Sequence, residues 1–159
     1  MADDPTLVET ARRIIADNLY MTLATADAAG RPWATPVYFA PVDDQELVWV
    51  SRPEARHSQN IAVRPDIGIV VFDSRVPISS GQGVYMSAAA ELVPAAELDR
   101  CLEAYSRSCQ DRGGSSWSTD DVRQGARLRL YRATASARWI LDSHDQRVSL
   151  DPQATRWET

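Results

Sequence analysis

The chain has 159 residues, of which 44% are hydrophobic and 25% are charged, and this composition is typical of one globular domain with a hydrophobic core. Its formal net charge of -5 argues against nucleic acid or an anionic membrane as a partner, because both require a dominant basic surface. All 17 basic residues are arginines, which excludes Schiff-base chemistry on a lysine and the lysine of a phosphate-binding P-loop.

The cysteines and histidines show no pattern of a metal site. Cys101 and Cys109 lie on one predicted helix, too far apart for a disulfide within it. His57 and His144 have no neighbours at metal-ligand spacing, so no metal is predicted. Because the sequence contains no recognisable signal peptide and no long apolar run, we expect a cytoplasmic protein that does not enter a membrane.

The first element predicted is an amphipathic helix within residues 1–18. Asp3 and Asp4 before Pro5 form an N-cap with proline in the first helical position. Apolar residues then recur at helical spacing until about Asn18. This spacing predicts about three turns with one apolar face.

A β-hairpin is predicted next, with strands over residues 19–25 and 32–39 and a turn at 27–30. Pro36 lies inside the second strand and has no backbone N–H to donate. The second strand is therefore expected to be an edge strand, to contain a bulge, or to pass close to a ligand.

A strand, a turn and a helix start follow, and they gather several anion-binding groups. Residues 46–50 form an apolar strand, 51–53 break it, and 54–63 have helical composition until Arg64 and Pro65 end the helix. The turn and the start of the helix carry polar side chains at Ser51, Arg56, His57, Ser58 and Asn60. A helix N-terminus offers free N–H groups and a positive dipole end, so this is a candidate phosphate site. The alternative is an ordinary helix that Ser51 caps and that has a solvated polar face.

Three more strands and one more helix complete the prediction. Strands are expected over 66–73 and 84–93, a helix over 94–110, and a strand pair or one long bent strand over 128–142. The tail from 151 onward should be frayed and flexible. The acidic pairs are interpreted as turn and helix-cap residues, at Asp43, Asp44, Asp120 and Asp121.

Six short strands with hairpin-like connections and two to three helices predict a single domain over residues 1–159 of the mainly β (α+β) class. A small antiparallel barrel with flanking helices fits this order better than a doubly wound parallel sheet, in which strands alternate with long helices. No nucleophile elbow, Walker loop, zinc-protease motif or Rossmann fingerprint is present, so these enzyme classes have no support.

The order of several short segments resembles the pyridoxamine 5′-phosphate oxidase-like flavoproteins. The segments are residues 30–37, 49–51, 56–60, 64–65 and 130–133, with Trp139 following. The resemblance implies a six-stranded, Greek-key split β-barrel that binds FMN, and a homodimer with two cofactor sites at the subunit interface. Its relatives include reductases that use the deazaflavin coenzyme F-420 instead.

The resemblance also implies which residues bind the cofactor. Ser51, Arg56 and His57 fall where the family holds the cofactor phosphate, which agrees with the interpretation of the helix start. Thr35 to Val37 fall where the second strand runs along the flavin ring. The full set of cofactor-binding residues that we predict is Thr35, Pro36, Val37, Val50, Ser51, Arg56, His57, Asn60, Gln82, Arg132 and Trp139; no side chain is predicted to act as a catalytic acid or base.

The sequence departs from the oxidases at functional positions. Thr35 and Ala40 stand where the oxidases carry an arginine and a lysine, and the second basic phosphate ligand is His57. The aromatic and arginine pattern that clamps pyridoxal phosphate is not recognisable in residues 128–142. We therefore expect a flavin-dependent oxidoreductase that acts on a different small molecule. The alternatives are a deazaflavin-dependent reductase and a non-enzymatic flavin- or heme-binding protein on the same barrel.

Overall fold

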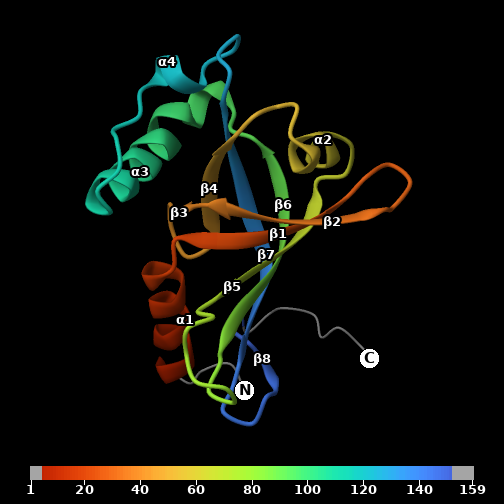
Figure 1. Ribbon diagram of the computed structural model, residues 1–159, viewed down its shortest axis with the longest axis vertical. Coiled ribbons are helices and arrows are strands. Elements are labelled where there is room, and N and C mark those ends of the chain that lie inside the picture. The colour runs from red at the N-terminus through yellow and green to blue at the C-terminus, as the bar shows by residue number, and fades with distance from the viewer. Residues whose placement is uncertain (1–4, 152–159) are drawn as a thin grey trace.

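The computed structural model describes residues 5–151, which form one antiparallel sheet and the helices that flank it (Figure 1). Along the sheet the strand order is β2-β1-β5-β6-β7-β4-β3, and β8 pairs with β7. The strands are β1 Tyr20–Ala26, β2 Pro32–Tyr38, β3 Ala40–Pro41, β4 Glu46–Ser51, β5 Asp66–Phe72, β6 Gly83–Leu92, β7 Arg129–Leu141 and β8 Arg147–Ser149. The helices are α1 Pro5–Asp17, α2 Arg56–Val63, the 3-10 helix η1 Ala95–Glu97, α3 Leu98–Asp111 and α4 Thr119–Val122.

The sheet curls around one core and leaves the barrel split between β2 and β4. Val37 of β2 and Trp49 of β4 belong to the same buried cluster, although these strands lie near opposite ends of the sheet order. Leu23, Ile69 and Met86 occupy one register row across β1, β5 and β6 within that cluster. The predicted mainly β architecture with flanking helices is confirmed.

The predicted number of six strands is wrong, since the described residues contain eight. The two strands missing from the prediction are β3 and β8, which have two and three residues. Such short segments have no hydrophobic period of their own and become strands only because β4 and β7 pair with them. Residues 128–142 form one long strand, β7, whose pairing with β6 contains a register shift between Ser87 and Ala88.

The first helix and the hairpin match the prediction. Helix α1 ends at Asp17 and packs its apolar residues Leu7, Val8, Ile14 and Ile15 against the barrel core. The expected cap at Asp3 and Asp4 lies outside the described residues. Of the tail expected to be flexible from 151 onward, only Asp151 is described, and its carboxylate pairs with Arg138. Pro36 lies on β2, which is an edge strand as predicted.

A second core lies on the other face of β4 and β7, beneath α3 and α4. Val48 and Leu130 of the strands pack there with Leu102 and Tyr105 of α3. The acidic pairs have the structural roles that we expected. Asp121 forms a capping box with Ser118 at the start of α4, and Asp43 accepts hydrogen bonds from two backbone N–H groups in the turn before β4.

None of the helices in the part of the chain that is described is long and apolar enough to span a membrane.

A candidate phosphate site at the first turn of helix α2

Helix α2 packs against β1, β2 and β6 (Figure 1). Asn60 donates from its side-chain amide to Thr25 Oγ1 of β1 at 3.0 Å, and Ile61 enters the barrel core. On the other side, Ser51 at the end of β4 makes a 2.6 Å hydrogen bond to His57 Nε2. These contacts fix the start of α2 between strands that are far apart in the sheet order.

The start of α2 is not capped as one interpretation of the sequence expected. The helix begins at Arg56, its N-cap residue is Ala55, and no side chain makes a cap hydrogen bond there. Ser51 belongs to β4 and its hydroxyl is bound to His57, so the prediction of Ser51 as the cap is wrong. A turn of four residues separates β4 from α2. Among the described residues, no side chain accepts a hydrogen bond from the backbone N–H groups of the first turn of α2.

His57 and Ser58 are buried polar residues in this first turn. Burial lowers the pKa of His57, which favours the neutral imidazole. When the ring proton is on Nδ1, the Ser51 hydroxyl donates to Nε2. Ser58 is 3% exposed, and its buried hydroxyl has no hydrogen-bond partner among the described residues. An unpaired buried hydroxyl is costly, so Ser58 at an uncapped helix start is a candidate ligand-binding group.

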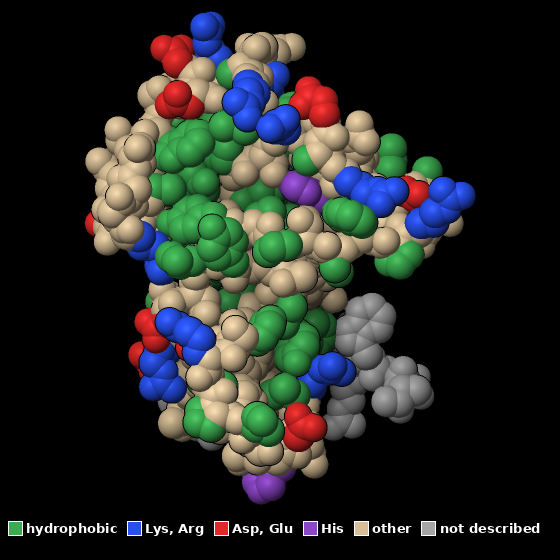
Figure 2. All heavy atoms as spheres, viewed as in Figure 1, with side chains coloured by type: hydrophobic (Ala, Val, Ile, Leu, Met, Phe, Trp, Pro, Cys, Tyr) green, Lys and Arg blue, Asp and Glu red, His purple; other side chains and the backbone are tan. Residues whose placement is uncertain are grey.

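Arg56 supplies the positive charge at this site. Its side chain is exposed, and within residues 5–151 no hydrogen bond or ion pair engages its guanidinium. The guanidinium carbon lies 4.7 Å from the centre of the Trp33 ring of β2. Arginine side chains also gather over α2 and the projecting β1–β2 hairpin (Figure 2), where Arg31, Arg52 and Arg64 are exposed.

The sequence analysis missed the roles of Ser58 as an unpaired group and Trp33 as the contact of Arg56. A signal for Ser58 existed, since Ser58 and the core residue Ile61 are three positions apart and share one helix face. No sequence signal could have paired Trp33 with Arg56, because they meet only when α2 folds back onto the hairpin.

The remaining predicted residues fall in three different places. Thr35, Pro36 and Val37 lie on β2 close to α2, with Val37 buried and Pro36 exposed. Val50 lies next to Ser51, but its side chain packs toward the second core under α3. Gln82 immediately precedes β6 and donates to the backbone carbonyl of Leu141, near Trp139 of β7. In the strand order, β1 and β5 lie between β6 and β2. With strands about 4.8 Å apart, that is about 14 Å along the sheet from the β2 group.

Arg132 lies in a separate ion cluster. Its guanidinium pairs with Glu46, Glu91 and Glu97, and Arg100 pairs with Glu46 and Glu97. This cluster joins β4, β6, β7 and α3 on the side opposite the barrel core. Arg132 therefore does not meet Arg56 or His57 within one chain.

One group of potential metal ligands lies in the same cluster, at Glu46, Glu97 and Cys101. Arg100 and Arg132 already bind both carboxylates, and burial raises the pKa of the Cys101 thiol, which disfavours the thiolate that a metal requires. The cluster is thus better suited to joining secondary-structure elements than to holding a cation.

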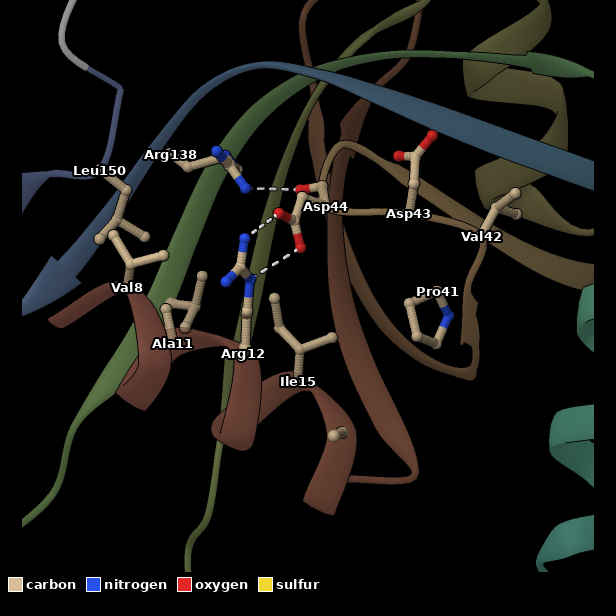
Figure 3. Close-up of a pocket in the computed structure, with 12 residues that line it drawn as sticks. Val8, Ala11, Arg12, Ile15, Pro41, Val42, Asp43, Asp44, Arg138 and Leu150 are labelled. Atoms are coloured by element: carbon tan, nitrogen blue, oxygen red, sulfur yellow. Dashed lines mark hydrogen bonds and ion pairs between the residues drawn. The ribbon is translucent and has the colours of Figure 1, made fainter. Parts of the chain in front are cut away.

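A cavity of about 320 Å³ lies between α1 and the β3–β4 turn (Figure 3). Its walls are mainly aliphatic, from Val8, Ile15 and Leu150. At its edge Arg12 forms an ion pair with the Asp44 carboxylate at 2.5 Å, and Arg138 donates to the Asp44 carbonyl oxygen (Figure 3). None of the predicted cofactor residues lines it, so this cavity is distinct from the α2 site.

The comparisons with known proteins place the chain in a known fold. The family model described as pyridoxamine 5′-phosphate oxidase matches residues 7–139. No curated protein sequence matches the chain.

Among solved structures, a heme binding protein from Mycobacterium smegmatis aligns with 89% of this chain at 19% identity and a TM-score of 0.72, and this chain spans 56% of that protein's chain. The heme storage protein HutZ from Vibrio cholerae aligns with 82% of this chain at 19% identity and a TM-score of 0.66, and 90% of that chain is covered. An F420 reductase aligns with 80% of this chain at 20% identity and a TM-score of 0.58, and 94% of that chain is covered. At these identities the likeness shows the fold.

Proposed function

Because this chain belongs to the pyridoxamine 5′-phosphate oxidase family, we propose that it binds FMN and acts as a flavin-dependent oxidoreductase on a small molecule other than pyridoxamine 5′-phosphate. One observation carries the proposal. The first turn of α2 combines free backbone N–H groups, the unpaired Ser58 hydroxyl and the unpaired charge of Arg56. These groups fit a phosphate, which offers several acceptor oxygens and negative charge at a helix N-terminus.

The phosphate ligands that we propose are Ser51, Arg56 and His57, together with Ser58. No described hydrogen bond engages His57 Nδ1, so in the tautomer with the proton there it is available to donate to an anion. The Ser51 hydroxyl holds the ring from the opposite nitrogen, which fixes its orientation. The guanidinium of Arg56 offers two parallel N–H donors.

The flavin, when bound, supplies the electron or hydride transfer, and the protein supplies binding, orientation and exclusion of water. Thr35, Pro36 and Val37 lie on the edge strand β2 beside α2, with Pro36 exposed and Val37 buried, and we place the ring along this strand. The absence of an N–H at Pro36 leaves the edge without a donor at that point.

We also propose that the protein is a homodimer whose partner subunit completes each site. Gln82 immediately precedes β6 and Trp139 lies on β7, three and four strands from β2 in the sheet order, so they are separated along the sheet from the edge beside α2. The outer face of the sheet carries a register row of Thr22, Val70, Tyr85 and Trp139, and none of these residues belongs to either core cluster. Exposed Tyr20 and Phe72 extend this face, and apolar and aromatic surface favours a twofold interface. A monomeric mass by light scattering at micromolar concentration, with flavin bound, would contradict the dimer.

The phosphate site is tested by the Arg56→Ala variant. The variant should bind FMN about tenfold to a hundredfold more weakly, because a charged hydrogen bond contributes about 1.5 to 3 kcal/mol. Riboflavin, which lacks the phosphate, should bind both proteins equally. Titration of flavin fluorescence measures both affinities, and Arg31→Ala removes a nearby exposed charge as the control. Unchanged FMN affinity in Arg56→Ala would mean that the phosphate lies elsewhere.

Inefficient oxidation of pyridoxamine 5′-phosphate is a separate expectation. A phosphorylated substrate needs a second charged clamp, and the arginines of β7 are already engaged. Arg132 pairs with glutamates, Arg138 pairs with Asp151, and Arg129 donates to backbone carbonyls. A turnover of pyridoxamine 5′-phosphate of about 1 s⁻¹ or faster by the flavin-loaded protein would refute this expectation.

The structural likeness to heme proteins and to an F420 reductase supports two alternatives, heme binding and deazaflavin binding. Heme iron needs an axial ligand, and His57 Nε2 is already bound to Ser51. The other histidine, His144, is exposed on the β7–β8 turn with its Nδ1 3.8 Å from Asp142, which suits it better as an iron ligand. The visible absorption spectrum of the purified protein distinguishes flavin, deazaflavin and heme.

A further inference from the structure

We infer that Trp33 is a positioning residue that holds the Arg56 guanidinium for phosphate binding, an inference that rests on the proposed function. The Arg56 guanidinium carbon lies 4.7 Å from the centre of the Trp33 ring, within the range of a cation–π contact. Trp33 is 40% exposed on the edge strand β2, and Arg56 is the first residue of α2. The contact therefore joins the two elements that border the proposed cofactor site.

A contact with an aromatic ring, unlike an ion pair, can leave the donors of Arg56 free. A guanidinium that stacks on a ring uses its flat face, whereas its five N–H groups project from its edge. An ion pair with a carboxylate would instead occupy these donors. Within the described residues, Arg56 has no ion pair and no hydrogen bond, although it lies near enough to Asp27 for its charge to contribute to lowering the pKa of that carboxyl, after the backbone hydrogen bonds from Arg31 and Ala29.

Other arginines of the chain are held by polar partners. Arg12 and Arg138 bind carboxylates, and Arg64, at the other end of α2, donates to the carbonyl oxygens of Asp27 and Ala28. Arg56 differs from these three because an aromatic face restrains it and no described hydrogen bond uses its donors; Arg147, over the Tyr85 ring at 4.8 Å, is held in the same way but lies on β8, away from α2. Restraint before binding removes the cost of ordering a long exposed side chain when the phosphate arrives.

The test is a double-mutant cycle on the ratio of FMN affinity to riboflavin affinity, which isolates the contribution of the phosphate. Trp33→Leu should lower this ratio about twofold to fivefold, the scale of an exposed cation–π contact. Trp33→Phe keeps an aromatic face and should retain most of the ratio. In the Arg56→Ala background, Trp33→Leu should change the ratio no further, whereas in the Arg31→Ala background its effect should persist.

The outcomes separate the inference from the proposed function. If Arg56→Ala abolishes the preference for FMN but Trp33→Leu leaves it intact, the positioning role is refuted and the phosphate site stands. If Trp33→Leu weakens FMN and riboflavin equally, Trp33 contacts the flavin or supports the fold, and the positioning role is again refuted. In the cofactor-free protein, the NMR shift of the Arg56 side-chain Hε should move in Trp33→Leu because the ring current is lost. An unchanged shift would show that the contact does not form in solution.

Discussion

The Arg132 cluster and the first turn of α2 use the same kinds of side chain in opposite ways. In the cluster, Arg132 is 14% exposed and meets Glu46, Glu91 and Glu97, so its charge is balanced within the chain. At the first turn of α2, Arg56 has no ion pair and the buried Ser58 hydroxyl has no partner. The first region joins parts of the fold, and the second has polar groups without partners among the described residues.

This difference identifies the site better than residue type does. The sequence predicts both Arg56 and Arg132 as cofactor-binding residues, with Arg56 at the phosphate, but of the two only Arg56 has no hydrogen bond or ion pair among the described residues. A buried polar group normally finds a partner during folding. The described residues contain two exceptions, Trp49 Nε1 in the barrel core and the Ser58 hydroxyl in the first turn of α2, and only the second lies beside the unpaired charge of Arg56. Three predictions test the difference between these two regions.

The largest effect is expected from Arg132→Met, which keeps the apolar stem and removes the charge. Glu46, whose side chain is 11% exposed, would keep only Arg100 as a partner. Removing one member of a buried ion pair costs about 3–5 kcal/mol. Because Arg100 remains, we expect a loss of about 2 to 3 kcal/mol in the free energy of unfolding, measured by urea denaturation.

The same variant decides whether Arg132 also binds the cofactor. We expect its ratio of FMN to riboflavin affinity to equal that of the wild type. A tenfold fall in the ratio would restore Arg132 to the cofactor-binding set that the sequence predicts. Arg107→Ala removes one half of an exposed pair on α3 and serves as the stability control, with an expected change below about 1 kcal/mol.

A medium effect is expected from Ala55→Asp. Ala55 is the N-cap residue of α2, in the extended conformation that suits a capping side chain, and it provides no cap. Aspartate should stabilise the free protein by about 1 kcal/mol. It should also weaken FMN binding, because its carboxylate occupies the same N–H groups and repels the phosphate.

Ala55→Asn is the matched variant, since it caps the helix without adding charge. It should stabilise the protein similarly and weaken FMN less than Ala55→Asp does. If Ala55→Asp stabilises α2 and FMN affinity is unchanged, the phosphate does not use this helix terminus.

The smallest effect is expected from pH and concerns His57. Burial holds the pKa of His57 below its value of about 6.5 in the unfolded chain. As the pH falls through that unfolded value, the unfolded chain takes up a proton that the folded chain does not, so stability is lost. For one group the slope is at most about 1.4 kcal/mol per pH unit.

The measurement is urea denaturation of the cofactor-free protein between pH 7.5 and 5.5. His57→Gln should flatten the dependence over this range. The exposed His144 pairs weakly with Asp142 on the β7–β8 turn, so His144→Gln is the control. A pH dependence that is identical in wild type and His57→Gln would rule out His57 as its source.

Local patterns predicted much of the fold, because strands such as β5 and helices such as α3 have their own periodicity. The start of α2 is predicted only approximately. The loop between β4 and α2 has a composition similar to that of a first helical turn, so composition does not show where the loop ends and the helix begins. The ion pairs of Arg132 could not be predicted, because its partners Glu46, Glu91 and Glu97 lie in segments far from it in the sequence. The assignments of Gln82 and Trp139 to the cofactor remain predictions.

Both edges of the sheet contain proline, which limits the pairing of these edges with strands of other copies at high protein concentration. The edge strand β2 contains Pro32 and Pro36, and the opposite edge strand β3 ends at Pro41 after only two residues. Proline breaks the row of donors on which a foreign strand would assemble, and a very short strand offers little to copy. Growth of a continuous sheet from chain to chain is thereby disfavoured at both edges, so we expect that any copies of this protein that associate do so through the faces of the sheet.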